Sequence, residues 1–524
     1  MARRPDDDHA TTPFPLAPIS NGEWVPGPPT EKQRLAAKLI AEESAVQARR
    51  HGMTRAQFLR TAAATSTAFM VLNKVYGLDA WGDNAVLPLV KADHCDDLDG
   101  ARELLDRRNF VMDVQTHHID LNPPVDPNLV APPLLATIIR TFCQTLRFVD
   151  SGDLMCPEVT GQLNFIKEMF VDSQTSVAVI SGLPEQLEIP GLPFAGSRLP
   201  SGLPLTPSSM AATRDRVNEL AASRRCITQA MIDPKVAPGS ATAIDSLEHQ
   251  VRDLGAAAIK CYTYNDNWRL DDENVAYPLW EEATRLGLTL VNVHKGLPLT
   301  AFGVQLPEYV RTTDFPKVVR DWPNLKFCAY HSGYFSRGDH PEGKDAGYHP
   351  DNEPEIPGRW GNVEFIEQIA SLPKRLRRNV YAEIGSTFAI TFLQGPDQAA
   401  HLLGRLLLAL GSKNILWGTD SIWWGSPQWL IDAFNTLEIP ASMRETYGYP
   451  RLTKKIKQRI LGLNAARLYG VKKPDRRNLC TIPEDQLSQL QVAQGGFRAG
   501  RSLRAYGARS RREFFAMFGR KLRA

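Results

Sequence analysis

Three residues that commonly bind metals stand at the ends of short apolar runs in this chain. His294 ends LTLVNVH, His331 ends LKFCAYH and Asp420 ends NILWGTD, while a fourth run, NFVMDVQTHH, carries Gln115 and His117 near its end. Imidazole and carboxylate donors of this kind hold divalent metals such as zinc. One histidine after an apolar run is usually an ordinary core or loop residue. Four such runs in order favour a shared site.

The apolar runs predict parallel strands, since continuous hydrophobicity is typical of strands covered on both faces by helices. The predicted strands are 109–114, 175–181, 224–232, 255–262, 288–294, 325–331, 379–384 and 414–420. The predicted helices between them include 243–254, 273–286, 306–321, 362–372, 396–411 and 427–437. Strand and helix in alternation predict a (β/α)8 TIM barrel, in which active-site residues gather at the C-terminal ends of the strands.

These strand ends resemble those of the amidohydrolase superfamily, and within it the amidohydrolase-2 group that includes aminocarboxymuconate-semialdehyde decarboxylase. The family pattern Asp-x-His-x-His resembles Asp113 to His117, with Gln115 in place of the first histidine. The family's strand-five histidine, strand-six histidine and strand-eight aspartate match His294, His331 and Asp420.

The resemblance implies one divalent metal, for which zinc is favoured and manganese or iron are alternatives. Its implied ligands are His117, His294, His331 and Asp420, with Gln115 as a further candidate. A glutamine carbonyl is neutral and a weaker donor than imidazole or carboxylate. Some members of the group lack that histidine, carry an acidic residue instead and still hold a metal.

The resemblance also implies a hydrolase that uses a metal-activated water on a small carbonyl substrate, such as a lactone or an amide. Asp420 is then the proton shuttle, and His331 is a catalytic residue as well as a ligand. The same residues could serve a non-oxidative decarboxylation of an aromatic or unsaturated acid. A degenerate, non-catalytic barrel that binds a ligand or partner is a third hypothesis, which Gln115 keeps open.

Three further residues are predicted to contact the substrate because they end, or follow, predicted strands. They are Lys260, Glu383 and Trp423. Each has an ordinary structural alternative: a lysine that extends its stem along apolar surface, a carboxylate in a salt bridge, and a tryptophan that caps the barrel core.

The chain divides into three predicted parts. Residues 1–107 form an N-terminal extension with a helix at 31–50, and residues 108–472 form the barrel. The segment ILGLNAARLYG at 460–470 resembles the family's closing helix, and residues 473–524 form a basic C-terminal tail with interleaved phenylalanines. That tail is expected to pack as a solvated helix, with an amphipathic membrane-surface helix as the alternative.

Three long connections follow predicted strands: 118–173, which contains a helix-like stretch at 130–149, then 182–210 and 332–361. Connections at this position are expected to cover the mouth of a barrel, where specificity loops lie. The alternative is that they are insertions without a role in the site, or the contact of a homodimer.

Composition excludes several kinds of partner. The formal net charge of +3 over 524 residues gives no indication of a nucleic-acid partner, so a small-molecule substrate is expected. No run of 18 apolar residues is present, which argues against an ordinary membrane span. The seven cysteines show no CxxC spacing, which argues against a disulfide framework.

One segment resembles a twin-arginine export signal. Thr54–Arg60 reads TRAQFLR, with Ala56 where the second arginine would stand, and a weakly apolar stretch follows at Thr61–Leu72. This predicts a periplasmic or cell-envelope protein. The alternative is a cytoplasmic protein in which the segment is an amphipathic helix packed on the barrel.

Overall fold

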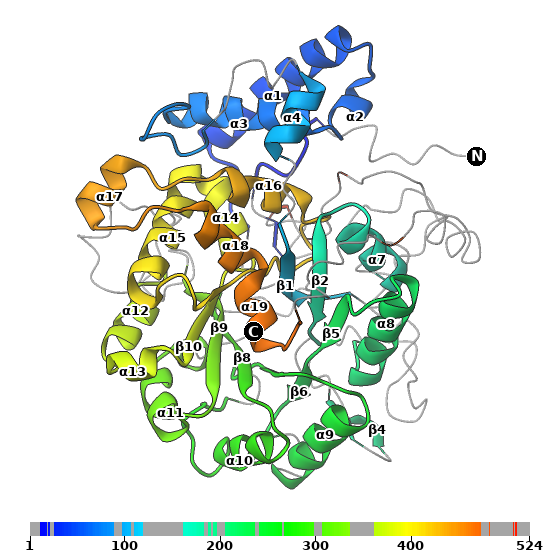
Figure 1. Cartoon of the computed structure of the whole chain (residues 1–524), viewed down its shortest axis with the longest axis vertical. Helices are drawn as coiled ribbons and strands as arrows, with labels where there is room; N and C mark the ends of the chain where they lie inside the picture. The colour runs from blue at the N-terminus through cyan, green and yellow to red at the C-terminus, as the bar shows by residue number, and fades with distance from the viewer. Residues whose placement is uncertain are drawn as a thin grey trace.

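The computed structural model covers a barrel with a helical extension above it (Figure 1). It describes residues 11–17, 19–20, 26–88, 97–105, 109–118, 161–182, 187–189, 192–195, 205–235, 240–264, 267–297, 307–335 and 361–472, with residues 482, 503, 507, 509 and 510. The predicted helix at 130–149 and the C-terminal tail helix lie outside the described residues.

Parallel strands form the centre of the molecule. They are β1 (Val111–Thr116), β2 (Thr175–Ile180), β5 (Cys226–Thr228), β6 (Ala230–Ile232), β7 (Ile259–Cys261), β8 (Leu290–Gly296), β9 (Lys326–Tyr334), β10 (Val380–Glu383) and β11 (Ile415–Leu416). One sheet has the order β1-β2-β5, and the other has the order β11-β10-β9-β8-β7-β6. The predicted strands and the (β/α)8 fold class are therefore confirmed.

The two sheets are joined on both sides. Gln229 separates β5 from β6, so that the first half of this strand pairs with β2 and the second half with β7. On the other side, the segment after β11 bonds to β1: Val114 N donates to Trp417 O at 3.0 Å and His117 N to Ser421 O at 2.7 Å. These bonds bring the ends of the first and eighth strands together, which matters for the site.

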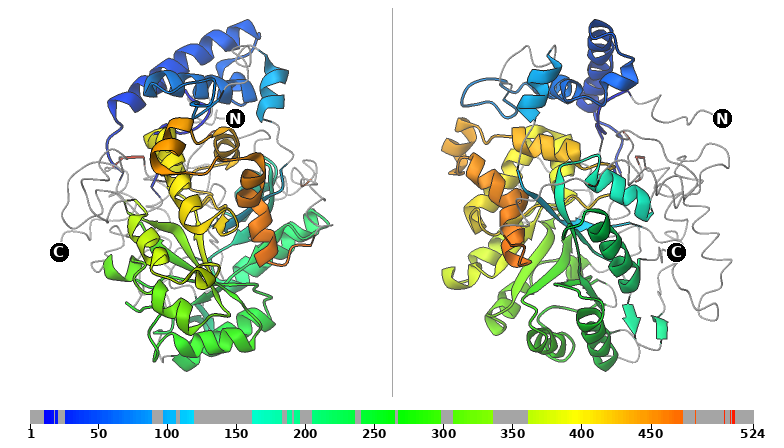
Figure 2. Two further views of the ribbon diagram at one scale, coloured as in Figure 1. Left: turned by 60° about the vertical axis from the view of Figure 1, so that its left-hand side comes forward. Right: turned by 45° about the vertical axis from the view of Figure 1, so that its right-hand side comes forward.

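Helices cover the outside of the strands (Figures 1 and 2). They are α7 (Gln162–Phe170), α8 (Pro207–Leu220), α9 (Ser240–Arg252), α10 (Tyr277–Arg285), α11 (Phe315–Asp321), α12 (Val363–Ala370), α13 (Lys374–Arg377), α14 (Thr387–Gln394), α15 (Pro396–Leu410), α16 (Gln428–Thr436) and α17 (Ala441–Tyr447). A short 3-10 helix, η4 (Pro307–Val310), precedes α11. Both faces of each strand are thus buried, as the continuous apolar runs require.

The structure adds elements that the sequence pattern did not predict. The helices α7 and α8 lie in or beside the long connections after β1 and β2, and a small antiparallel hairpin, β3 (Leu187–Ile189) with β4 (Leu192–Ala195), lies in the second. The helix α14 is also unpredicted, because TFAITFLQ is only eight residues long and buried over 387–393. A short, mainly apolar run cannot be assigned to helix or strand by periodicity alone.

The N-terminal extension packs on the barrel rather than standing apart from it. It contains α1 (Glu31–Arg50), α2 (Arg55–Phe58), α3 (Ala62–Tyr76) and α4 (Leu98–Leu105). The Phe69 ring of α3 contacts Phe392 of α14 at 6.0 Å between centroids, and Gln33 Nε2 donates to Leu393 O at 2.8 Å. All three views place these helices on one side of the barrel, outside its ring of helices and next to α14 and α16 (Figures 1 and 2).

A short helical run lies against the start of β1: α18 (Lys454–Gln458), the π-helical turn η7 (Arg459–Leu463) and α19 (Asn464–Leu468). Gly462 lies against the backbone of Phe110, where a Cβ would stand 2.5 Å from the carbonyl oxygen. The Tyr469 hydroxyl accepts from Asn292 Nδ2 at 3.1 Å inside the barrel. Within the described residues, no helix has the length and apolarity to cross a bilayer.

Candidate active site

The first and eighth strands place His117 and Asp420 in contact. The backbone bond from Asp420 N to Gln115 O, 2.9 Å long, aligns the two strand ends. His117 Nε2 lies 3.2 Å from Asp420 Oδ1, while His117 Nδ1 lies 2.7 Å from Ser181 O. Both side chains are almost fully buried.

The fifth and sixth barrel strands place His294 and His331 side by side. Their ring centroids are 4.5 Å apart and the rings are inclined at 60°. His331 Nδ1 lies 2.9 Å from Gly385 O, and His294 Nε2 lies 3.1 Å from Leu297 O. A carbonyl oxygen only accepts hydrogen bonds, so these ring nitrogens are the protonated ones.

Gln115 connects the two halves of the site. Its Nε2 lies 3.1 Å from Asp420 Oδ1 and 3.3 Å from His331 Nε2. The amide therefore donates to two atoms that a metal ion would use as ligands. Among the described residues, Gln115 Oε1 has no hydrogen-bond partner. The four strand ends thus bring His117, His294, His331 and Asp420 together, with Gln115 among them. Their roles as metal ligands or catalytic residues stay predictions.

The protonation states suit metal ligands. Burial, followed by the neighbouring His331 ring, lowers the pKa of His294 well below its usual value, and burial lowers the pKa of His331 to about 4. Both rings are therefore neutral near pH 7. Each donates one N–H to a backbone carbonyl, which fixes the tautomer and leaves the second nitrogen with a lone pair. Metal-binding histidines are commonly oriented in this way.

The three buried carboxyl groups near the site differ in charge. Burial raises the pKa of Asp420, but the hydrogen bond and charge of His117, together with His331 and the hydrogen bond from Ser386, lower it overall. Burial raises the pKa of Asp113 to about 7, against hydrogen bonds from Thr419 and Gln115, and raises the pKa of Glu383 to about 8. Asp420 is thus the carboxylate that stays ionised.

Several residues of the site have strained backbone. His331, Ser332, Ser386 and Asp420 all have φ between 54° and 64°, in the left-handed region that side chains other than glycine disfavour. Such conformations cost on the order of 1–3 kcal/mol each and persist only where the surrounding structure enforces them. Despite the positive φ at His331, β9 extends beyond its predicted end at 331 to Tyr334, where Leu297 N donates to Tyr334 O at 2.7 Å.

The donor types, three imidazoles and one carboxylate, suit a divalent cation. In the described residues no group of three or more His, Cys, Asp or Glu side chains has the mutual geometry of a metal site. The donors instead bond to one another and to Gln115. Yet both ring nitrogens of His117 face oxygen acceptors, and a neutral imidazole has only one N–H. A divalent cation held by His117 Nε2 and Asp420 Oδ1, which lie 3.2 Å apart, would satisfy both of these groups.

Lys260 lies inside the barrel rather than at an open mouth. Its side chain is fully buried, and its Nζ is 4.0 Å from the centroid of the Tyr330 ring and 4.6 Å from that of Tyr262. A cation over two ring faces is held by their quadrupoles. Tyr262 in turn stacks on His294, with centroids 5.6 Å apart. The predicted substrate contact of Lys260 stays a prediction.

The other predicted substrate residues are also buried. The Glu383 carboxylate accepts from His331 N at 3.1 Å and from Gly385 N, an arrangement that orders the backbone around the site. Trp423 lies in the hydrophobic core with 4% of its surface exposed. His118, whose neighbour His117 faces Asp420, instead lies against Phe165, with the ring centroids 5.4 Å apart and the rings inclined at 44°.

Sequence reasoning missed Ser386. Its Oγ donates to Asp420 Oδ2 at 2.6 Å and accepts from Trp424 Nε1 at 3.4 Å. A serine three residues beyond the end of β10 carries no motif of its own, so only the tertiary contact identifies it.

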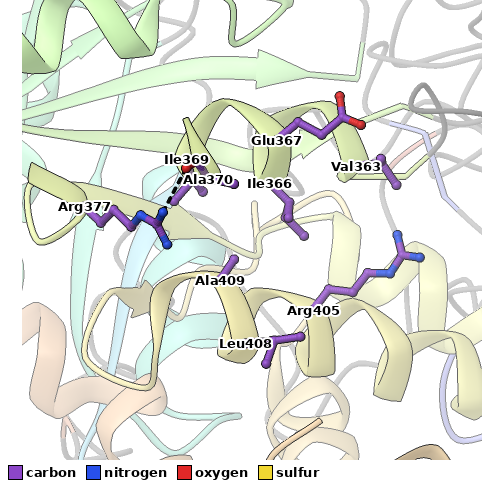
Figure 3. A pocket seen from close by; sticks show the side chains of 9 residues that line it. All are labelled: Val363, Ile366, Glu367, Ile369, Ala370, Arg377, Arg405, Leu408 and Ala409. Atoms are coloured by element: carbon purple, nitrogen blue, oxygen red, sulfur yellow. Dashed lines mark hydrogen bonds between the residues drawn. The ribbon is translucent and has the colours of Figure 1, made fainter. Parts of the chain in front are cut away.

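A separate groove lies on the outside of the barrel, between α12 and α15 (Figure 3). It has a volume of about 250 Å³ and is floored by apolar side chains, with Leu408 60% exposed at its edge. Arg377 borders it and donates to Ala370 O at 2.8 Å, so this arginine caps α12. The groove shares no residue with the cluster at the strand ends.

The family model described as amidohydrolase, of the amidohydrolase-2 type, matches residues 209–471, which is half of the chain. The chain belongs to this amidohydrolase family. The matched region contains His294, His331 and Asp420. No curated protein matches. Membership makes the chain an enzyme of this superfamily.

Solved structures resemble the chain at low identity. A probable 2-pyrone-4,6-dicarboxylic acid hydrolase from Acinetobacter baumannii is 11% identical, with 69% of this chain and 99% of that one covered and a TM-score of 0.38. The 5-carboxyvanillate decarboxylase from Sphingomonas paucimobilis is 14% identical, with 69% of this chain and 99% of that one covered and a TM-score of 0.37. A dihydroxybenzoic acid decarboxylase from Polaromonas with bound manganese is 15% identical, with 70% of this chain and 99% of that one covered and a TM-score of 0.35. Similarity at this level does not identify a reaction.

Proposed function

We propose that this amidohydrolase is a metal-dependent hydrolase that acts on a small carbonyl substrate, such as a lactone or an amide. The observation that carries the proposal is the convergence of three oriented imidazoles and one ionised carboxylate at adjoining strand ends. Family membership supports an enzyme with a divalent metal, and the reaction itself is the proposed part.

His117, His294, His331 and Asp420 would hold the metal, with zinc favoured and manganese or iron as alternatives. When bound, a divalent metal supplies a Lewis acid and lowers the pKa of a coordinated water to about 7. Gln115 would have to release its two hydrogen bonds to Asp420 and His331 for these atoms to become ligands.

Asp420 would act as general base and then as general acid. Its Oδ2 accepts from Ser386, so its Oδ1 is the oxygen directed toward His117 and Gln115, where substrate chemistry is proposed. Because its pKa is lowered overall, Asp420 is ionised near pH 7 and can accept a proton. Lys260, Glu383 and Trp423 are proposed to contact or surround the substrate.

A non-oxidative decarboxylation of an aromatic or unsaturated acid uses the same residues, with Asp420 returning its proton to the carbon that loses the carboxylate. A substrate screen separates the two reactions. Purified full-length protein is incubated with lactones, amides, and aromatic or unsaturated acids, and hydrolysis and CO2 release are followed in parallel. Turnover of carbonyl compounds without CO2 supports the hydrolase, and CO2 release from an acid overturns it in favour of the lyase.

Metal analysis tests the site itself and excludes a degenerate barrel. We expect about one divalent metal per chain, and much less in His294→Ala and His331→Ala, because each removes one of few strong ligands. His249→Ala is the matched control, since this histidine pairs with Asp253 on the outer helix α9. Unchanged metal content in both site variants would overturn the proposal.

A further inference from the structure

The turn after β10 has an unusual backbone. Thr387 N donates to Gly385 O at 2.6 Å, which makes a three-residue γ-turn with Ser386 at its centre. Ser386 has φ 56° and ψ −42°, close to the rare and strained form of this turn with positive φ. The turn is fully buried, so the surrounding structure has to hold it in place.

The same turn contacts two of the proposed metal ligands directly. The Gly385 carbonyl oxygen accepts from His331 Nδ1 at 2.9 Å, and Ser386 Oγ donates to Asp420 Oδ2 at 2.6 Å. One strained turn therefore sets the tautomer and orientation of a histidine from the sixth strand and the rotation of an aspartate from the eighth.

Neighbouring groups fix the turn and the direction of its hydroxyl. Trp424 Nε1 points at Ser386 Oγ at 3.4 Å, which directs the hydroxyl hydrogen toward Asp420. The Glu383 carboxylate accepts from the Gly385 N–H and from His331 N at 3.1 Å. A Cβ on Gly385 would stand 2.4 Å from Glu383 Oε1, so only glycine fits between these groups.

We propose that Ser386 is a positioning residue of the metal site, which holds the Asp420 carboxylate so that Oδ1 faces the other ligands. The inference rests on the proposed function, in which Asp420 is a ligand. Without the hydroxyl, Asp420 Oδ2 loses its donor and the carboxylate can rotate away from the ligand position. Partners that orient ligands in this way typically account for about 10–100-fold in metal affinity.

The test measures Zn2+ and Mn2+ affinity of the full-length protein by chelator competition. Ser386→Ala and Ser386→Gly both remove the hydroxyl, but glycine adopts positive φ without strain and so preserves the turn. We expect both to bind metal about 10–100-fold more weakly than the wild type. Thr387→Val is the matched control, because among the described residues the Thr387 hydroxyl bonds to Ile384 O, just before the turn, and to no proposed ligand. It should stay within about threefold of the wild type, since it orients no ligand.

A double variant shows whether Ser386 acts through Asp420. If it does, Ser386→Ala combined with Asp420→Asn binds metal as weakly as Asp420→Asn alone, within about threefold, whereas independent effects multiply. Ser386 variants that bind like Thr387→Val, beside a weakened Asp420→Asn, would overturn the inference and leave the proposed ligand set standing. An Asp420→Asn protein with wild-type metal affinity would overturn that ligand set, and the inference with it.

Discussion

At the scale of single residues, backbone carbonyls decide which nitrogen each histidine can offer. Ser181, Leu297 and Gly385 each accept one imidazole N–H. The remaining nitrogens are Nε2 of His117, Nδ1 of His294 and Nε2 of His331. Because these bonds are made by rigid strand ends and turns, the ligands are oriented before any metal arrives. Pre-orientation of this kind reduces the free-energy cost of assembling a site.

Asp420→Asn tests the proton shuttle. The amide is nearly isosteric, so most of the fold should remain, but it cannot accept and return a proton near pH 7. General acid–base catalysis contributes about 10²–10⁴-fold, so we expect turnover to fall by that factor, and further if the carboxylate also binds metal. Asp432→Asn, a buried aspartate on α16, is the control. If metal-loaded Asp420→Asn turns over within a factor of about two of the wild-type rate, Asp420 is not the shuttle, and Glu383 or His118 becomes the candidate.

Gln115→Glu tests whether the amide limits metal binding. A carboxylate is a charged ligand and cannot donate to Asp420 and His331, so we expect affinity for Zn2+ or Mn2+ to rise about tenfold. The metal-free protein should lose on the order of 2 kcal/mol of stability, because a fourth buried carboxyl group replaces two hydrogen bonds. Thermal unfolding with and without metal measures both effects.

The control for Gln115 is Gln229→Glu, another buried glutamine inside the barrel, which bonds to Tyr330 and Ser181. It should destabilise the protein without changing the metal response. If added metal raises the unfolding temperature of the two variants equally, position 115 lies outside the metal site.

At the scale of elements, the N-terminal helices and the barrel form one packed unit. The rings of Phe69 and Phe392 meet at 6.0 Å, and Phe14 stacks on Trp429 at 5.1 Å. Backbone bonds from Glu438 and Ala441 to Val86 and Asp83 extend the contact to α17. The surface of α14 and α16 that the extension covers is apolar, so the barrel would expose it to water if the extension were removed.

Phe69→Ala tests this packing. The ring is fully buried, and truncation of a buried phenylalanine costs about 3–5 kcal/mol. We therefore expect the urea midpoint of the whole chain to fall in a single transition. Trp81→Ala is the control, because that ring is 61% exposed and its loss should cost little. Equal midpoints for the two variants, or a separate early transition that leaves the barrel unchanged, would contradict the packing argument.

At the scale of the whole molecule, the export prediction concerns a segment that has a place in the fold. Thr54 caps α2 through Gln57, and Phe58 and Leu59 are fully buried beside α3. Arg55 remains exposed. A receptor would have to recognise Phe58 and Leu59 before this region folds, since burial removes them from contact.

Cell fractionation tests export. If Thr54–Arg60 acts as a twin-arginine signal, the full-length protein should be found in the envelope fraction, and Arg55→Gln should shift it to the cytosol. Arg50→Gln is the control, because Arg50 is out of register with Phe58 and Leu59. A wild-type protein found only in the cytosol would dismiss the prediction.

The sequence by itself determined the barrel and the residues of its strand ends. Apolar runs of limited length, each followed by a helix-like stretch, leave few arrangements other than parallel strands. Their last residues must then share one rim, so His294, His331 and Asp420 could be assigned together. The tertiary structure decided the rest. It alone shows Gln115 bridging Asp420 and His331 and the strained turn at Ser386 holding both, because these contacts join strands far apart in sequence and depend on left-handed backbone that no local pattern encodes.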